Sequence, residues 1–179
     1  MRSILFSLLL LSFLLHPVYV AESKQSNVQP DSNQLYQVVR AIDADTLELS
    51  GGERVRLIGI DTPESRYNSK LYRDAKRTGE PPDGILAMGK LAHRFTKDLV
   101  EGKKVRLEFD VQQRDRYGRL LAYVFLEDST FVNAEIVKQG YAQIMTVPPN
   151  VKYKDLFLRL QKEAREDGRG LWASNDGYY

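Results

Sequence analysis

The chain has 179 residues, of which 42% are apolar and 28% are charged, a composition typical of one globular domain with its own core. Its 26 lysines and arginines nearly balance its 24 acidic residues, and a net charge of +2 is too small to hold a polyanion by bulk attraction. With no cysteine and two histidines, disulfide scaffolds, thiolate metal sites and histidine-rich metal sites are excluded.

The N-terminal segment has the layout of a secretory signal peptide. Arg2 precedes an apolar run from Ile4 to Leu15, which is shorter than the roughly 20 residues that a membrane span needs. We therefore expect residues 1–21 to direct export, so that the protein is secreted or periplasmic; retention of this leader as a membrane anchor is the alternative. Residues 22–34 are polar, bury too little to order themselves, and are expected to form a flexible linker.

The folded domain is expected to span residues 35–175 and to begin with strands. Apolar and β-branched residues alternate with polar ones in several short runs, and the turn Ser50–Glu53 joins two of these runs into a hairpin. We expect about five strands in all. The predicted strands cover residues 37–41, 46–49, 54–60, 104–109 and 120–126, with 131–132 as a short last strand.

Helical spacing of apolar residues predicts three helices. The first is capped by Asp83 and runs to about Leu99, the second starts at Asn133 and stops at Gly140, and the third follows Tyr153. Strands and helices do not alternate regularly, which indicates an α+β domain rather than a doubly wound sheet. A small closed Greek-key barrel is the expected form.

Two apparent motifs are incomplete and are rejected. Residues 84–90 match most of a phosphate-binding P-loop, but Leu91 replaces the required Ser or Thr and no strand precedes the segment, so an amphipathic helix explains it. Asp43 and Asp45 have the spacing of the first two ligands of a calcium-binding EF-hand loop, yet the glycine and the distal glutamate that such a loop requires are absent.

Acidic residues follow the predicted strands at positions where they could bind a metal ion. Asp45 follows the first strand, and Asp61 and Glu64 follow the hairpin. Two carboxylates about 4 Å apart repel by about 4 kcal/mol at an effective dielectric of about 20, unless a cation lies between them. Because the available ligands are all oxygens, the pattern favours Ca²⁺ or Mg²⁺ over zinc.

Two arginines complete this pattern. Arg56 lies on the strand that leads to Asp61, and Arg119 stands at the start of a later strand. Guanidinium groups match phosphate oxygens with two parallel hydrogen bonds, which lysine cannot do. Each of these residues alone has an ordinary explanation as a turn or surface residue, but a metal site beside two arginines indicates phosphoryl chemistry.

Five segments, in chain order, carry a resemblance to a known family: Asp43–Thr46, Arg56–Glu64, Asp115–Tyr123, Val132–Gly140 and Gly170–Trp172. They resemble the thermonucleases, the staphylococcal nuclease-like family of Ca²⁺-dependent nucleases, over about residues 35–172. The resemblance implies an α+β fold, a five-stranded OB-fold barrel with three helices, in agreement with the fold predicted from periodicity.

The same resemblance implies roles for individual residues around the metal. Asp45 and Asp61 would ligate Ca²⁺ through their side chains, and Thr62 would do so through its carbonyl. Glu64 would be the general base that accepts a proton from the attacking water. Mg²⁺ in place of Ca²⁺ is the alternative.

Residues that bind substrate are also implied. Arg56 and Arg119 would bind the scissile phosphate and stabilise its transition-state charge, while Arg116 and Tyr117 would lie near a terminal phosphate of the bound nucleotide. The basic and aromatic stretch of residues 66–77 is expected to be a surface loop, either a lid over the cleft or a solvated segment without substrate contact.

The function implied is that of an exported endonuclease that hydrolyses phosphodiester bonds of DNA and RNA with little sequence preference and leaves 3′-phosphate ends. It would act as a monomer, without a stable protein partner. The alternative is a noncatalytic OB-fold module that binds nucleic acid, and the intact acidic and arginine positions favour the enzyme.

Overall fold

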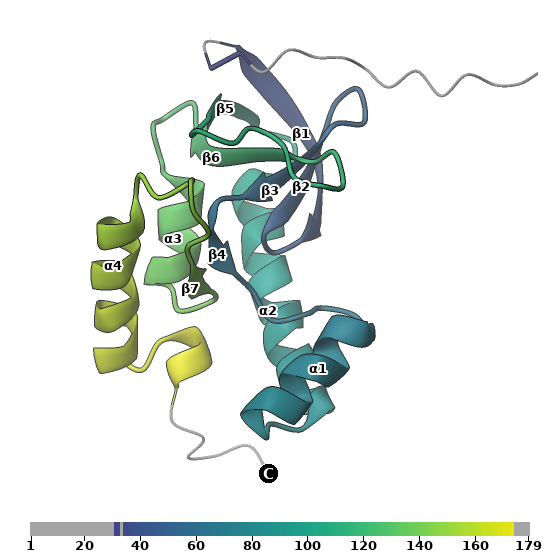
Figure 1. Ribbon diagram of the computed structural model, residues 1–179, viewed down its shortest axis with the longest axis vertical. Helices are drawn as coiled ribbons and strands as arrows, with labels where there is room; N and C mark the ends of the chain where they lie inside the picture. Colours follow the sequence, from purple (N-terminus) through teal and green to yellow (C-terminus); the bar gives the residue numbers. More distant parts are fainter. Residues whose placement is uncertain (1–30, 33, 174–179) are drawn as a thin grey trace, which may run out of the picture.

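The computed structural model of the protein describes residues 31–32 and 34–173, so the predicted signal peptide (1–21) and most of the predicted linker (22–34) lie outside the described residues. The described part of the chain forms a closed five-stranded barrel flanked by helices (Figure 1). The predicted α+β class and five-stranded OB-fold barrel are confirmed. None of the helices in these described ranges is long and apolar enough to cross a membrane.

The barrel strands follow one another in the order β1-β2-β3-β6-β5, and β5 closes the barrel by pairing with β1. All of these pairs are antiparallel except β3 with β6, which run parallel. Successive side chains of a strand point to opposite faces, so every second residue can enter the core. In β5, Val105 and Leu107 are fully buried between more exposed neighbours. The strand bounds are β1 Leu35–Asp43, β2 Thr46–Leu49, β3 Arg54–Leu57, β5 Lys104–Glu108 and β6 Leu120–Leu126.

The predicted strand 54–60 is divided in two. β3 ends at Leu57, and β4 (Gly59–Asp61) leaves the barrel to pair with β7 (Gln143–Met145) in a separate two-stranded sheet. The break occurs at Gly59, whose φ of +83° few other residues adopt, and a Cβ there would lie 2.6 Å from the ring of Phe157. The bend directs the residues after β4 toward the end of the barrel.

α2 and α3 pack against the barrel, and α1 and α4 pack on these two helices (Figure 1). α2 packs along β1 and contacts α1 and α3, while α4 packs on α3 and β7. The predicted strand at 131–132 is wrong, because Val132 is already the first residue of α3. The helix bounds are α1 Ser69–Thr78, α2 Pro82–Val100, α3 Val132–Lys138 and α4 Lys154–Glu166, followed by the 3₁₀ turn η1 Gly170–Trp172.

The described chain therefore has four α-helices rather than the predicted three. The additional helix is α1, which lies in the stretch that we expected to be a loop. The Asn68 side chain accepts a hydrogen bond from the Leu71 backbone N–H at 2.9 Å and caps its start, and Gly79 ends it in the left-handed conformation. Leu71 is its one buried residue, so polar residues dominate the helix and conceal its periodicity.

Two predicted helix caps are also wrong. Asp83 lies inside the first turn of α2, where its carboxylate accepts a hydrogen bond from the Tyr67 hydroxyl at 2.6 Å. The helix starts one residue earlier, at Pro82, because the fixed φ of proline suits the first helical turn.

Asn133 is likewise not a cap but the second residue of α3, and it is fully buried. Its side chain accepts a hydrogen bond from the Val124 backbone N–H and donates one to the Ile58 carbonyl, both at 3.0 Å. Asn133 thereby ties α3 to β6 and to the break between β3 and β4, because both buried backbone groups need partners.

Candidate active site

Asp45 lies in the turn between β1 and β2 and is almost completely buried. One of its carboxylate oxygens accepts hydrogen bonds from the Thr62 backbone N–H at 3.1 Å and from the Thr62 hydroxyl at 2.9 Å. The other accepts a hydrogen bond from Thr46. These bonds join the β1–β2 turn to the segment that follows β4, so two of the predicted metal ligands, Asp45 and Thr62, lie side by side.

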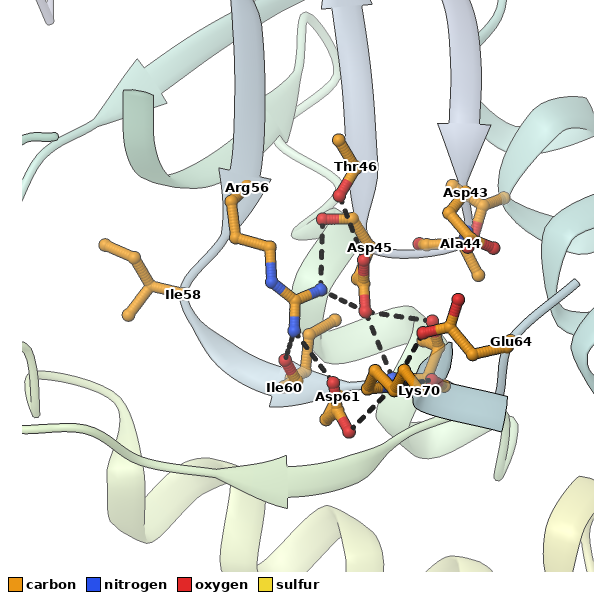
Figure 2. A network of polar contacts seen from close by, with 12 residues as sticks. Asp43, Ala44, Asp45, Thr46, Arg56, Ile58, Ile60, Asp61, Glu64 and Lys70 are labelled. Atoms are coloured by element: carbon orange, nitrogen blue, oxygen red, sulfur yellow. Dashed lines mark hydrogen bonds and ion pairs between the residues drawn. The ribbon is translucent and has the colours of Figure 1, made fainter. Parts of the chain in front are cut away.

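Arg56 connects the carboxylates of this site (Figure 2). It lies on β3, and its guanidinium forms an ion pair with Asp45 and another with Asp61, at 2.9 Å in the second case. It also donates to the Ile60 carbonyl at 3.1 Å. Burial lowers the pKa of the Arg56 guanidinium, the charge of Asp61 opposes that shift, and the nearby charge of Arg119 reinforces it.

Arg119 stands immediately before β6, which runs beside β3 with Leu121 opposite Arg56. Since side chains alternate along a strand, Arg119 and Arg56 project from the same face of the sheet. The Arg119 Nε donates to an Asp115 carboxylate oxygen at 2.7 Å, and its backbone N–H donates to the other at 3.0 Å. Asp115 thus orients Arg119, a role that we did not predict although Asp115 belongs to the same sequence segment.

Asp61 and Glu64 share a second cation, Lys70 of α1 (Figure 2). Its ammonium lies 2.8 Å from a Glu64 oxygen, 3.4 Å from an Asp61 oxygen and 3.3 Å from the Thr62 carbonyl oxygen. Burial alone would lower the pKa of Lys70, but its hydrogen bond with Glu64 and the surrounding carboxylates outweigh burial and raise the pKa. The sequence identified Lys70 only as part of a basic stretch, because α1, the helix that positions its side chain, was not predicted.

Glu64 is held from two further directions. Its second carboxylate oxygen accepts a hydrogen bond from the Asn68 amide, the same side chain that caps α1. Behind it, α2 passes so close that a Cβ on Gly89 would overlap the Glu64 carbonyl. Only a glycine permits this packing, so Gly89, which belongs to the rejected P-loop motif, has a structural purpose that its local sequence does not reveal.

The other side of α2 supports the turn that carries Asp45. The Thr96 hydroxyl donates to the Ala44 carbonyl at 3.0 Å, and the His93 Nε2 lies 2.8 Å from the Ala41 carbonyl. Thr96 is fully buried, which leaves its hydroxyl no other role than this bond. α2 is therefore the rigid element against which both acidic segments rest.

Arg116 and Tyr117 lie on the turn between Asp115 and Arg119. The Tyr117 ring is 68% exposed, and the guanidinium groups of Arg116 and Arg119 lie 4.8 and 5.6 Å from its centroid. Arg116 also donates to the Tyr117 hydroxyl at 2.6 Å. The predicted substrate-binding pair is thus adjacent to Arg119, and the Tyr117 backbone N–H donates to the same Asp115 carboxylate at 2.9 Å.

The oxygen donors of the acidic cluster fit a hard divalent cation. Within residues 31–32 and 34–173, no group of three acidic, histidine or cysteine side chains converges closely enough to form a metal site as the side chains stand. Instead, Arg56 and Lys70 neutralise the carboxylates. The Lys70 ammonium already lies among two carboxylates and a backbone carbonyl, the ligand types that Ca²⁺ and Mg²⁺ prefer. The assignment of metal ligands therefore stays a prediction, and the oxygen atoms present are suitable donors for such an ion.

Comparisons with known proteins agree with this arrangement. The sequence model of the staphylococcal nuclease homologue family matches residues 54–174. The chain is 41% identical over 140 residues to the thermonuclease of Staphylococcus intermedius, covering 76% of this chain and 75% of that protein. It is 35% identical over 154 residues to the thermonuclease of Staphylococcus hyicus, covering 84% and 83% of the two chains.

A third relative, endonuclease YncB of Bacillus subtilis, is 37% identical over 144 residues, covering 78% of this chain and 61% of that protein. The matched residues include Arg56, the segment from Asp61 to Glu64, and Arg119. The chain therefore belongs to the staphylococcal nuclease family, and it is a nuclease, a hydrolase that acts on nucleic acid.

Proposed function

We propose that this protein is an exported Ca²⁺-dependent endonuclease that hydrolyses phosphodiester bonds of DNA and RNA with little sequence preference and leaves 3′-phosphate ends. The observation that carries the proposal is the continuous chain of ion pairs from Asp45 through Arg56, Asp61 and Lys70 to Glu64, with Arg119 immediately before the adjacent strand. All of these residues come from one chain, which supports action as a monomer. Mg²⁺ is the alternative ion.

Asp45, Asp61 and the Thr62 carbonyl would hold the ion. Bound there, a divalent cation would withdraw charge from a phosphoryl oxygen and orient the ester for in-line attack. The hydrogen bonds from Thr62 to Asp45 bring two of these three residues together before any ion binds. Asp45 and Thr62 are therefore neighbours without an ion, although within the described residues the acidic side chains do not yet converge on one point.

Glu64 is the proposed general base. Its carboxylate would accept a proton from water as the new bond to phosphorus forms. Contacts with Lys70, Asn68 and the backbone next to Gly89 restrict its position. Such positioning matters because a general base works only within hydrogen-bonding distance of the proton that it removes.

Arg56 and Arg119 would stabilise the negative charge that develops on the phosphoryl group. Each guanidinium has an acidic partner, Asp61 and Asp115 respectively, that fixes its orientation in advance. Donors that are already oriented toward developing charge need no reorganisation during the reaction. Removal of one such donor commonly costs about a hundred- to a thousandfold in rate.

Two features support binding of a nucleic-acid backbone without base selection. The exposed Tyr117 ring offers a stacking surface beside Arg116 and Arg119. The residues directly after Glu64 line a hollow of about 460 Å³ that has more basic than acidic side chains. Such a hollow suits contacts with phosphate groups, which carry no sequence information. The hollow is lined by Ser65, Arg66, Lys90, His93, Arg94, Lys97 and Asp98.

Export rests on the signal-like layout of residues 1–21. We expect the nuclease to be found outside the cytoplasm after expression of the full chain, with an N-terminus that starts near residue 22. Fractionation followed by N-terminal sequencing tests this directly. A membrane fraction with the intact leader would favour the anchor instead.

The catalytic proposal is tested with purified protein and denatured DNA, duplex DNA and RNA, each with CaCl₂, with MgCl₂ or with a chelator. We expect cleavage with Ca²⁺ and none with the chelator. The products should carry 3′-phosphates, so a polymerase should extend them only after phosphatase treatment. Cleavage that persists in the chelator contradicts the proposal, and binding without cleavage under every condition identifies a noncatalytic module.

A further inference from the structure

The Lys70 ammonium lies among oxygen atoms that would hold a metal ion. It is 3.3 Å from the Thr62 carbonyl oxygen and 3.4 Å from an Asp61 carboxylate oxygen, two of the three groups assigned to the metal. It is also 2.8 Å from Glu64 (Figure 2). One side-chain cation therefore already interacts with the oxygens that a divalent cation would use.

This position is determined by α1 rather than by chance contact of a long side chain. Lys70 is the second residue of α1, whose start is capped by Asn68 and whose fully buried Leu71 anchors the helix. The Lys70 side chain is 32% exposed, so water still reaches part of it. An element of this chain that the barrel does not require thus delivers a positive charge to the acidic cluster.

The two cations compete for the same oxygens. An ammonium and a divalent ion a few ångströms apart repel strongly in a partly buried site, because the effective dielectric is well below that of water. An ion close to the Thr62 carbonyl and the Asp61 carboxylate would lie beside the ammonium that now contacts both groups, and the two cations would repel each other. Binding of a metal therefore requires the ammonium to leave.

Asp74 is an alternative ion-pair partner for the Lys70 ammonium. It lies one turn further along α1, and its carboxylate is 3.5 Å from the Lys70 ammonium. Asp74 also pairs with Arg77 at 3.1 Å, so it stays oriented by its own helix. A rotation of the Lys70 side chain toward Asp74 would vacate the site without any change in the backbone.

We propose that Lys70 is an internal counter-cation of the metal site: it neutralises the acidic cluster in the metal-free protein and is displaced when a divalent ion binds, so that it sets the affinity for that ion. This inference rests on the proposed function, because it assumes that Asp61 and Thr62 ligate the metal.

The test compares the wild type with Lys70→Met, which keeps the apolar stem of the side chain and removes its charge. Calorimetric titration of the purified proteins with CaCl₂ should show about tenfold tighter binding to Lys70→Met, since no ammonium has to be displaced. Lys76→Met is the matched control, because Lys76 lies exposed on the same helix and its loss changes the net charge equally. Its affinity should equal that of the wild type.

Thermal unfolding gives a second readout that does not depend on activity. Without metal, Lys70→Met should unfold at a lower temperature than the wild type, because its carboxylates repel one another. Saturating Ca²⁺ should close that gap. Equal or weaker Ca²⁺ binding by Lys70→Met, beside a wild type that binds Ca²⁺, overturns the inference and leaves the proposed nuclease intact; no Ca²⁺ binding by either protein overturns both.

Labelling of the wild-type protein avoids any dependence on the folding of a variant. Acetylation of lysines, followed by mass spectrometry of the peptides, should show that Lys70 reacts faster when CaCl₂ is present, because the ammonium has lost its contacts with Glu64, Asp61 and the Thr62 carbonyl. Lys76 should react equally in both conditions. A Lys70 reactivity that Ca²⁺ leaves unchanged contradicts the displacement.

Discussion

The two halves of the active site depend on different kinds of structure. Asp45, Arg56 and Arg119 are positioned by barrel strands and the turns between them, where backbone pairing determines which side chains are neighbours. Asp61 and Glu64 lie beyond the break at Gly59, outside the barrel, and their side chains are held by α1 and by the close passage of α2. The first half is thus built by strand pairing within the barrel and the second by the packing of helices α1 and α2.

The comparison predicts which changes slow the chemical step most. Replacing Arg119 or Arg56 with Ala should lower kcat about a hundred- to a thousandfold, because each removes an oriented donor to the transition state. Steady-state kinetics on denatured DNA measures this. The control is Arg54→Ala, an exposed arginine on the same strand as Arg56, which should leave kcat within about twofold of the wild type. Equal losses for Arg54 and Arg119 would show that the effect is general charge rather than catalysis.

A second change tests the helix-supported half. Gly89→Ala should displace the segment that carries Glu64, because the new methyl group overlaps the Glu64 carbonyl. We expect a loss of about 1–3 kcal/mol in the free energy of unfolding from the overpacking. We also expect a roughly hundredfold loss of kcat from misplacement of the base.

Gly84→Ala is the matched control, since nothing lies within 4 Å of a Cβ at that position of the same helix. It should retain full activity and gain as much as about 1 kcal/mol of stability from better helix propensity. Denaturant unfolding and kinetics on both variants separate the two effects. If Gly89→Ala keeps wild-type kcat, α2 does not position Glu64.

The smallest expected effect comes from Asn68, which caps α1 and donates to Glu64, the proposed general base. Asn68→Ala should lower the free energy of unfolding by about 1 kcal/mol through loss of the cap. Asn68→Asp keeps a capping oxygen but replaces the amide that donates to Glu64 with a second negative charge. If the contact positions Glu64, Asn68→Asp should lower kcat by roughly tenfold at nearly unchanged stability; wild-type kcat in Asn68→Asp would show that the contact is only structural.

The same contrast explains how much of the molecule could be predicted from its sequence. The irregular order of strands and helices predicted the α+β class. The local pattern of alternating and β-branched residues predicted all five barrel strands. It also placed Asp45 and Arg56 at neighbouring strand ends, where the structure joins them by an ion pair.

Features that depend on distant contacts were not predictable in this way. Gly59 bends the chain because the Phe157 ring from α4 packs against it, and Gly89 is needed because a loop passes across it. Asn133 resembles a cap in its local sequence but is required by backbone groups far away in the chain. α1 has a single buried residue, so apolar periodicity gave no signal, although Asn68 and Gly79 marked its two ends.

The central claim is that Asp61 and its neighbours hold a divalent ion opposite the two arginines. Calorimetric titration with CaCl₂ of the wild type, Asp61→Ala and Asp155→Ala tests it most directly, with Asp155 as an exposed carboxylate on α4 remote in sequence from the site. We predict Ca²⁺ binding by the wild type and by Asp155→Ala, and affinity reduced by about a hundredfold or more in Asp61→Ala. Indistinguishable titrations of the wild type and Asp61→Ala would contradict the claim.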